Sequence, residues 1–385
     1  MFPACSLADA CGIAINFTFV LLKIQMNFSR QLLSWYNANK RSLPWRTTRD
    51  PYRVWLSEII MQQTRIEQGL PYYEKFVQAW PCVEDLAAAD EQEVLKCWQG
   101  LGYYSRARNL HETAGQIVKL YDGRFPGTYE SLKSLKGVGD YTAAAIASIV
   151  FDLPTPVVDG NVIRFLTRVY GITAPVDIQA TKNQILGIAL QNIDHRHPGD
   201  FNQAMMEFGA LVCTPANPGC RDCIFSSDCQ ALARGLVGSI PARSPKLPVR
   251  QRFMHYLVLT FTKGNKLYIY LNKRTGNDIW KNLYDFPQME APAGTAAGTP
   301  LNEAVLRRSF ILDHAEFEGS SSPYTHILTH QKIQARFYRF HSGNKIELPY
   351  LAVPLNELTS YSIPRLIERY LIESAILSTP RHPPS

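Results

Sequence analysis

The sequence lacks any uninterrupted apolar run of about 18 residues, the length that a membrane-spanning helix needs. Its closest approach, Gly12 to Leu22, is interrupted by Asn16 and Thr18. No Lys or Arg precedes this run and no small-residue cleavage site follows it, which argues against a secretory signal. We therefore expect no membrane association. We interpret residues 1–26 as an N-terminal extension ahead of a helix capped by Asn27 or Ser29.

Cysteine is also scarce, with 8 in 385 residues, too few for a disulfide-dense scaffold of this length. Charged residues make up 19% and hydrophobic residues 46%, a globular composition that excludes disorder for the bulk of the chain. The net charge of +7 is a mild basic excess. It permits an anionic partner such as nucleic acid without requiring one. No internal repeat is found, and the length suits two or three domains.

Helical periodicity dominates residues 27–235, which we interpret as one all-α domain. Apolar residues recur at helical spacing over 55–80, with a break expected at Gly69 to Pro71. The same spacing predicts helices over 91–102, 105–121, 140–151 and 161–171. Residues 236–252 are rich in Pro, Lys and Arg and lack periodicity, which predicts an extended basic linker.

Residues 253–377 have a different texture, with alternating β-branched and aromatic residues. Lys263 to Lys266 reads as the turn of a β-hairpin. Further strands are expected at 331–341 and 348–353, and helices at 302–310 and 363–377. This part is therefore predicted to be a separate α+β domain, followed by a disordered tail over residues 378–385.

Four of the cysteines are clustered as Cys213-x6-Cys220-x2-Cys223-x5-Cys229. Four thiolates this close in sequence are typical of a tetrahedral zinc site or an iron–sulfur cluster. Only one C-x2-C hook is present, and the wider spacings on either side favour the larger cluster. Such a site needs a reducing compartment, so we expect a cytoplasmic protein.

Three further features admit both a structural and a chemical interpretation. Gly137-Val138-Gly139 lies between two predicted helices, where it forms either a plain corner or a backbone phosphate site at a helix start. Asp159 follows an apolar stretch and is either an N-cap or a functional carboxylate. Glu58 lies in an apolar helical segment, either on a solvated face or in a dry cavity with a raised pKa.

Together these features resemble the helix-hairpin-helix DNA glycosylases of the endonuclease III superfamily, and within it the MutY-type adenine glycosylases. The matching strings are LPWR (43–46), WLSE (55–58), MQQTR (61–65), GLGYYSRAR (100–108) and VVDGN (157–161). The resemblance covers residues 27–235. It implies an all-α helix-hairpin-helix glycosylase domain with an iron–sulfur loop that carries one 4Fe–4S cluster.

The resemblance also implies a role for each matching residue. Glu58 would protonate adenine, and ionised Asp159 would stabilise the oxocarbenium ion or briefly capture C1′. Tyr141 and Asn161 would hold this pair in place. The remaining assignments are an adenine pocket of Trp45, Arg46 and Gln203; a DNA-binding set of Gln63, Thr64, Leu101, Tyr103, Gly137, Val138 and Gly139; and the cluster ligands Cys213, Cys220, Cys223 and Cys229. For Trp45 and Leu101 the alternative is core packing.

The C-terminal half resembles the Nudix-related domain of the same enzymes. The string WKNLYDFP (280–287) and the trio Tyr324, Thr325 and His326 carry this match, the trio being expected in a loop that reads 8-oxoguanine. The segment EAVLRRSF (303–310) lacks the glutamate cluster of a pyrophosphatase. We therefore expect a Nudix-like recognition module without hydrolase activity.

The implied function is excision of adenine opposite 8-oxoguanine or guanine in double-stranded DNA, by a nucleoid-associated monomer. One alternative is a bifunctional endonuclease III-type pyrimidine glycosylase, which uses a Lys two residues after the second hairpin Gly. Tyr141 occupies that position here. The other is a non-catalytic damage sensor, which would not need both Glu58 and Asp159.

Overall fold

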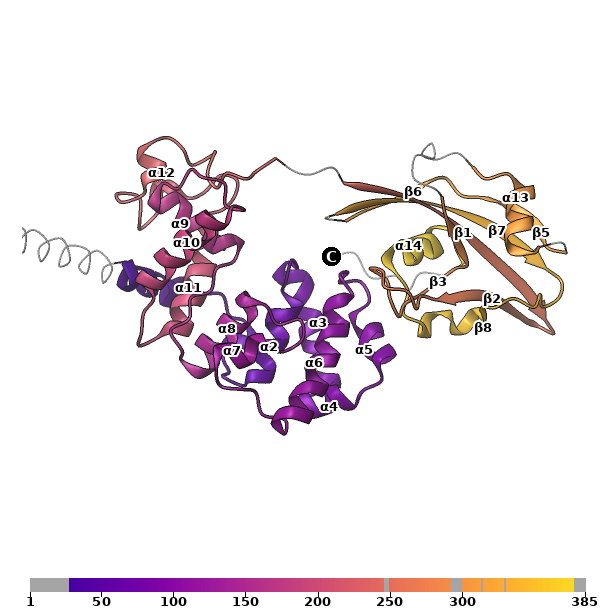
Figure 1. The fold of residues 1–385 in the computed structure, drawn as a ribbon, viewed down its shortest axis with the longest axis horizontal. Helices are drawn as coiled ribbons and strands as arrows, with labels where there is room; N and C mark the ends of the chain where they lie inside the picture. Colours follow the sequence, from indigo (N-terminus) through magenta and orange to yellow (C-terminus); the bar gives the residue numbers. More distant parts are fainter. Residues whose placement is uncertain (1–27, 246–248, 292–299, 313, 329, 377–385) are drawn as a thin grey trace, which may run out of the picture. The chain divides into compact units, whose positions relative to one another are not determined.

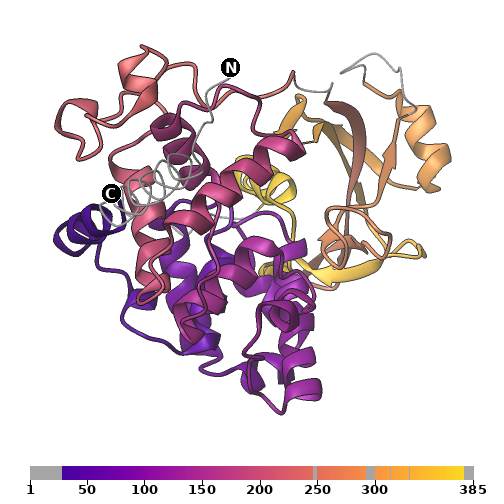
Figure 2. The same cartoon turned by 60° about the vertical axis from the view of Figure 1, so that its left-hand side comes forward.

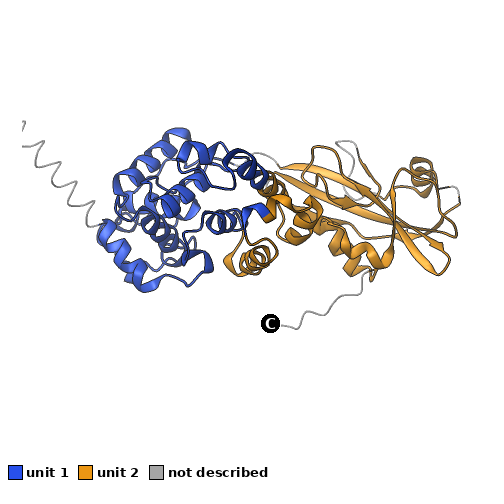
Figure 3. Cartoon of the chain, turned by 90° about the horizontal axis from the view of Figure 1, so that it is seen from below, with its two compact units in different colours: residues 1–63, 82–84, 113–246 blue, residues 64–81, 85–112, 247–385 orange. Residues whose placement is uncertain are grey.

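The computed structural model describes residues 28–245, 249–291, 300–312, 314–328 and 330–376, so the predicted extension and tail lie outside the described residues. None of the helices in these ranges is long and apolar enough to cross a membrane. The chain forms two compact units (Figure 3). Unit 1 comprises residues 1–63, 82–84 and 113–246, and unit 2 comprises residues 64–81, 85–112 and 247–385. Unit 2 thus adds a helical segment from the first half of the chain to the C-terminal half.

The regular elements among the described residues of unit 1 are all helices (Figure 1). Two helices have residues in both units: α4 (Val83–Ala88) and α6 (Ser105–Tyr121). The elements of unit 1 itself are a helix over residues 28–39, η1 (Pro44–Arg46), α2 (Pro51–Ile60), α7 (Tyr129–Lys133), α8 (Asp140–Phe151), α9 (Gly160–Tyr170), α10 (Gln179–Asn192), α11 (Pro198–Leu211), η2 (Cys220–Asp222) and α12 (Gln230–Ala233).

Helix α9 is the central element of its part of unit 1. Asp159 caps its first turn by accepting from the Val162 amide, and Gly171 ends it in the left-handed conformation at φ 65°. The helix packs against α10, α11 and α12, an arrangement that Figures 1 and 2 both display. The cap at one end and the glycine at the other explain why the helix covers the predicted segment.

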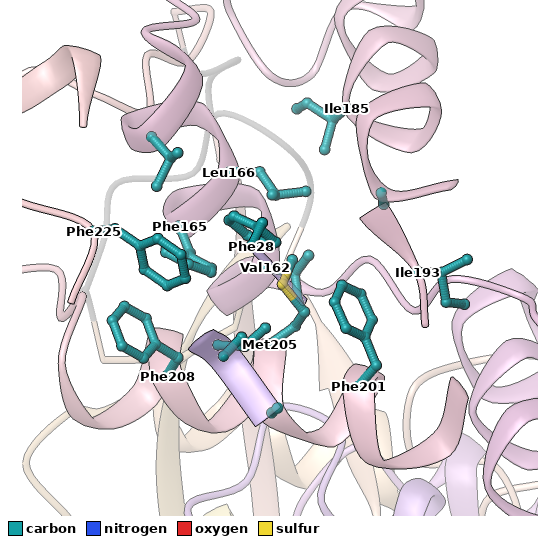
Figure 4. Packing of buried hydrophobic residues seen from close by; sticks show 14 of the residues in the cluster. Phe28, Val162, Phe165, Leu166, Ile185, Ile193, Phe201, Met205, Phe208 and Phe225 are labelled. Atoms are coloured by element: carbon teal, nitrogen blue, oxygen red, sulfur yellow. The ribbon is translucent and has the colours of Figure 1, made fainter. Parts of the chain in front are cut away.

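The core around α9 is aromatic (Figure 4). Phe165 of α9 lies 4.7 Å from the Phe208 ring and 5.3 Å from the Phe225 ring, measured between centroids. Phe28 stacks on Phe165 at 5.8 Å. Phe225 belongs to the cysteine segment, so this segment is attached to the core by an aromatic ring as well as by its backbone.

The expected helix break at Gly69 to Pro71 is wrong. The chain breaks earlier, between the end of α2 at Ile60 and the start of α3 (Ile66–Ala79), where Gln63 takes a positive φ of 54°. Pro71 lies inside α3 and removes one backbone donor from that helix. The helix continues because Tyr73 and Phe76 beyond the proline are buried, and burial outweighs the lost hydrogen bond.

Unit 2 contains an eight-stranded mixed sheet in which β1 and β7 pair in parallel and the other pairs are antiparallel. The predicted hairpin at Lys263 to Lys266 is confirmed, since these residues pair across the turn. The strands are β1 (Arg250–Lys263), β2 (Lys266–Lys273), β3 (Tyr284–Asp285), β4 (Gln288–Glu290), β5 (Glu316–Ser320), β6 (Tyr324–Ile327), β7 (Gln331–Ser342) and β8 (Leu351–Pro354). A short η3 (Leu355–Ser360) follows β8.

Two helices cover opposite faces of this sheet. On β7, Tyr338 and Phe340 pack with Leu306 of α13 (Glu303–Phe310). The preceding side chain on β7, Phe337, stacks on Tyr370 of α14 (Arg365–Glu373) at 3.9 Å. Since neighbouring strand residues point to opposite faces, α13 and α14 enclose the sheet between them.

The helical segment of unit 2 is held to the sheet domain by backbone carbonyls. It contains α3, α5 (Glu91–Trp98) and the start of α6. Lys96 donates to the Tyr361 carbonyl at 3.2 Å, and Tyr104 donates to the Ile363 carbonyl at 3.2 Å. These bonds join residues that are far apart in sequence, and the helical periodicity gave no sign of them.

The predicted linker over residues 236–252 is shorter than expected. Arg168 of α9 donates to the Ile240 carbonyl at 3.0 Å, and the Val176 amide donates to the Ala242 carbonyl at 3.0 Å. Residues 236–245 are thereby fixed to unit 1, while residues 250–252 already belong to β1. Buried Ile240 was the signal in this otherwise polar stretch.

The aromatic cluster generates a stability prediction. Phe165→Ala removes a side chain that is 1% exposed, and we expect unfolding to cost about 3–5 kcal/mol less because a cavity remains. Leu120→Ala, at a side chain that is 64% exposed, is the control and should change stability by less than about 0.5 kcal/mol. Urea denaturation of both variants measures the difference. Equal midpoints for the two would contradict the assigned core.

Candidate active site

Glu58 lies near the end of α2, a helix that Asp50 caps by accepting from the Tyr52 amide. The residues around Glu58 are buried, and Glu58 itself is only 9% exposed. Burial raises its pKa to about 7, Tyr141 opposes this by hydrogen bonding, and the nearby Asp159 charge adds to it. Of the two interpretations open from the sequence, the buried one is confirmed. Such a carboxyl group holds a proton near neutral pH.

Asp159 forms the N-cap that the sequence allows, and its second carboxylate oxygen is held by a neighbouring side chain. Its Oδ1 accepts from the Val162 amide at 2.7 Å, as an N-cap does, and its Oδ2 accepts from Asn161 Nδ2 at 2.8 Å. Burial raises the pKa of Asp159 above its usual value, and these hydrogen bonds oppose the rise only in part. The carboxylate is therefore fixed in position and already solvated by protein donors.

Tyr141 and Asn161 lie where the resemblance implies. Tyr141 is in the first turn of α8, and its hydroxyl is hydrogen-bonded to Glu58 and lies near Asp159. Burial raises the pKa of Tyr141 most, and these two carboxyl groups raise it further. The same hydroxyl donates to Met206 Sδ at 3.4 Å. Asn161 bridges Asp159 and Arg164, whose Nη2 donates to Asn161 Oδ1 at 2.9 Å. The structure thus brings Glu58, Asp159, Tyr141 and Asn161 together in unit 1.

The adenine-pocket candidates converge on an acid that sequence reasoning missed. Arg46 donates to both oxygens of Glu207, at 2.9 and 2.7 Å, and Arg41 does the same. These two guanidinium groups lower the pKa of Glu207 to about 2 against the effect of its burial. Glu207 is the only charged residue in the apolar stretch 201–211, the same signal that singled out Glu58.

The other pocket candidates are buried beside this pair. Gln203 accepts from the Tyr36 hydroxyl at 3.0 Å, and the Arg46 guanidinium lies 5.6 Å from the Tyr36 ring centroid. Trp45 is 9% exposed on η1. Arg46 is therefore paired with Glu207. Among burial, Tyr141, Asp159 and Arg46, it is Arg46 that shifts the pKa of Glu58 least.

The four clustered cysteines line a single cavity, whose empty volume is about 370 Å³ including space open to solvent. Phe165, Phe208 and Phe225 complete its walls. No group of three or more His, Cys, Asp or Glu side chains within the described ranges is arranged to hold one metal ion. The structure therefore brings the four cysteines to the walls of one cavity.

Two arginines of α9 connect this cavity to the catalytic candidates. Arg164 Nε donates to the Cys213 carbonyl at 2.6 Å, and the same side chain reaches Asn161. Arg168 donates to the Thr214 carbonyl at 2.7 Å and lies 3.5 Å from Cys213 Sγ. The sequence offered a signal for both, since they are the charged residues of α9.

The DNA-binding candidates divide between the units. In unit 1, Gly137 has a positive φ of 71°, Val138 is buried and Gly139 precedes α8, as a helical hairpin requires. Asp140 at the start of α8 is paired with Lys133 at 2.5 Å and accepts from Tyr129 at 2.7 Å. Lys133 and Tyr129 thereby compensate the negative charge of the Asp140 carboxylate at the expected phosphate site.

The remaining DNA-binding candidates differ in exposure. Gln63 is exposed in unit 1. In unit 2, Thr64 accepts from Arg106 at 3.4 Å, and Tyr103 is 43% exposed with φ 46°. Leu101 is only 7% exposed, which favours the packing interpretation of its side chain.

The expected loop carrying Tyr324, Thr325 and His326 is instead strand β6, paired with β7. Tyr324 packs against Phe337 at 5.3 Å, and His326 lies 5.9 Å from the Trp280 ring centroid. Because side chains alternate along a strand, Thr325 points to the opposite face from its two neighbours. The loop prediction failed because the three residues carry strand-forming side chains that pair with β7.

The comparisons with known proteins agree with this two-part architecture. The family model for HhH-GPD superfamily base excision DNA repair proteins matches residues 56–186, and a NUDIX domain model matches residues 240–373. They confirm the predicted fold class, a helix-hairpin-helix domain plus a Nudix-like domain.

Several individual proteins are similar to this chain. The adenine DNA glycosylase of Mus musculus is 46% identical over 228 residues, covering 56% of this chain and 44% of that protein. The adenine DNA glycosylase of Buchnera aphidicola subsp. Baizongia pistaciae (strain Bp) is 35% identical over 300 residues, covering 77% and 83% respectively. A thermostable thymine-DNA glycosylase structure superposes with a TM-score of 0.52 at 30% identity, covering 55% of this chain and 98% of that one. The chain thus spans less than half of the length of the mouse protein.

The Glu207 cluster generates a pH-dependent prediction. Glu207→Gln leaves Arg41 and Arg46 without their carboxylate, and we expect a loss of about 3–5 kcal/mol of stability near neutral pH. Because the folded pKa of about 2 lies below the ordinary value of 4.5, this contribution is complete above about pH 4.5 and is lost as the pH falls towards 2. Urea unfolding of both proteins from about pH 7 to 3 measures the gap, and a gap that widens in acid would contradict the assignment.

Proposed function

This chain belongs to the adenine DNA glycosylase family, and we propose that it excises adenine paired with 8-oxoguanine or guanine in duplex DNA, starting base excision repair. One observation carries the proposal: two buried carboxyl groups of unit 1 lie in contrasting surroundings. Glu58 has a pKa of about 7, while Asp159 is fixed by backbone and side-chain donors. Cleavage of a glycosidic bond uses such a pair, one protonated and one ionised.

In this proposal Glu58 is the general acid. Adenine is a poor leaving group, so its departure requires a proton, which the Glu58 carboxyl delivers to N7 of the flipped-out base. Arg46, held by Glu207, lines the pocket with Trp45 and Gln203 and orients the base. Because burial raises the pKa of Glu58 to about 7, a substantial fraction of this carboxyl group is protonated at neutral pH.

Asp159 acts on the sugar. Its carboxylate stabilises the positive charge that develops at C1′, or captures it briefly, before water completes the hydrolysis. Asn161 donates to this carboxylate and thereby fixes the oxygen that faces the sugar. With Tyr141 in the place of the lysine of bifunctional enzymes, no amine is positioned to form a Schiff base, and the product is an intact abasic strand.

We further propose that Cys213, Cys220, Cys223 and Cys229 hold one 4Fe–4S cluster. Four thiols around one cavity supply the complete ligand set of such a cluster, which would order the surrounding segment. A thiolate-bound cluster requires a reducing compartment, so we place the protein in the cytoplasm, at the nucleoid.

Unit 2 would discriminate 8-oxoguanine from guanine. The lesion differs by a carbonyl at C8 and a hydrogen at N7, which a few directed hydrogen bonds can read. Thr325 offers a hydroxyl on one face of β6, while Tyr324 and His326 on the other face are packed against neighbouring rings. We therefore assign direct contact with the lesion to Thr325 and a supporting role to its neighbours.

The acid assignment predicts the outcome of one substitution. Glu58→Gln retains the shape of the side chain and loses the proton, so single-turnover release of adenine should fall by about two orders of magnitude or more. The wild-type rate should itself fall as the pH rises through about 7, because the protonated acid is the active form. The measurement uses duplexes with A opposite 8-oxoguanine, A opposite G, T opposite G, and thymine glycol, and identifies the released base.

Glu93→Gln on α5 is the matched control, since Glu93 is an exposed glutamate. It should release adenine at the wild-type rate. Wild-type release of thymine or thymine glycol without adenine would reject the proposed substrate. Normal adenine release by Glu58→Gln would reject the assigned acid while leaving the substrate intact.

The cluster assignment makes a separate prediction. The purified protein should be brown and contain about four iron atoms per chain. Cys223→Ser should lower both the iron content and the yield of folded protein, because metal binding contributes to folding. Cys97→Ser, at a buried cysteine outside the cavity, should retain the iron. A colourless wild-type protein with one equivalent of zinc would overturn the assignment.

A further inference from the structure

The Tyr141 hydroxyl has one proton and two polar neighbours. It donates to Met206 Sδ at 3.4 Å. It is also hydrogen-bonded to the Glu58 carboxyl. A phenol donates only one hydrogen bond, so the oxygen that donates to one neighbour must accept from the other.

The two neighbours differ in what they can do. A thioether sulfur is only an acceptor, whereas a carboxyl group donates when protonated and only accepts when ionised. With the Tyr141 proton directed at Met206, the phenol oxygen is free to accept, and Glu58 can supply that bond only in its protonated form. Once Glu58 is ionised, the Tyr141 proton is drawn to the carboxylate and away from the sulfur.

We propose that Met206 is a positioning residue for the acid: its sulfur holds the Tyr141 hydroxyl in the orientation that accepts a hydrogen bond from protonated Glu58. This inference rests on the proposed function, in which Glu58 is the proton donor. It adds to that function a side chain that selects the protonation state of the donor before the substrate arrives.

The surroundings of Met206 leave this role to its sulfur. Met206 packs against a buried cluster of Ala144, Ala145 and Val157, whose side chains contain no hydrogen-bonding atoms. The charged groups that face Glu58 are Asp159 and Arg46, and Tyr141 faces the same Asp159. Arg46 is itself bound by Glu207 on α11, the helix that carries Met206. Replacing Met206 changes none of these charges.

Met206→Leu tests the inference, because leucine has a similar volume and no acceptor. Protonated Glu58 then loses the partner that keeps Tyr141 accepting, so the pKa of Glu58 should fall by about half a unit to one unit. The direct measurement is the titration of the Glu58 carboxyl by NMR with isotope-labelled glutamate, identified by its absence in Glu58→Gln. Single-turnover adenine release should fall about three- to eightfold near pH 7.5 and be nearly unchanged near pH 5.5.

Met205→Leu is the matched control. Met205 is the adjacent methionine of α11, is 1% exposed and packs in the aromatic core. It should leave the Glu58 titration at its wild-type position. A second variant, Met206→Val, also lacks the acceptor and is used if Met206→Leu does not fold.

The role through Tyr141 is tested by a double-mutant cycle. In a Tyr141→Phe background Met206→Leu should cause no further shift, because no phenol proton remains to be held. An equal shift in both backgrounds, or an unshifted titration in Met206→Leu, would overturn the inference. The titration needs no substrate, so it decides the inference even if the wild-type protein releases no adenine. In that case the proposed function fails by itself.

Discussion

Two buried arginines of α9 hold the irregular cysteine segment of unit 1 and the residues after it in place. The cysteine segment and the residues after it have almost no regular secondary structure, so their carbonyl groups need partners from elsewhere. Arg164 binds the carbonyls of Cys213 and Gly209, each at 2.6 Å, and Arg168 binds those of Thr214 and Ile240. A guanidinium group offers five donors in one plane, which lets a single side chain satisfy several carbonyls at once. Without these two side chains, apolar packing of Phe225, Cys213, Cys223 and Ile224 would have to order the segment.

The same helix positions the catalytic candidates, so the two sites share one element. Asp159 and Asn161 lie at the start of α9, and Arg164 bonds to Asn161 one turn later. Helix α11 approaches this turn very closely: a Cβ added at Gly209 would lie 2.7 Å from the Asn161 carbonyl oxygen. Glycine is required there because only its backbone leaves room for this contact. A displacement of the cysteine segment would therefore move the amide that orients the Asp159 carboxylate.

Much of the fold and of the candidate site could be predicted from the sequence. Each feature that was missed has a physical explanation. The ends of α6 and α8 coincide with their predicted segments because strong apolar periodicity runs up to clear turn residues. The break before α3 was misplaced because Pro71 marks a turn in most sequences, whereas here tertiary burial retains the helix. Glu58 and Asp159 were found through motifs. Glu207, Arg164 and Met206 were missed because their partners are distant in sequence and each residue type has an ordinary structural use in a helix.

The strand that carries Thr325 illustrates a limit of a different kind. The trio was identified correctly as a segment, yet a strand alternates its side chains, so three adjacent residues cannot face one ligand together. The pairing with β7 that decides this depends on residues beyond the segment itself.

The pKa values of two buried glutamates of unit 1, Glu58 and Glu207, are shifted in opposite directions, and Arg46 contributes to the difference. Burial raises the pKa of both Glu58 and Glu207. Glu207 receives paired hydrogen bonds from Arg46 and Arg41, and its pKa falls to about 2. Arg46 is thereby committed to Glu207 and lowers the pKa of Glu58 least among the groups that act on it. The pairing of Arg46 with Glu207 is therefore consistent with the raised pKa of Glu58, on which the Arg46 charge acts only weakly.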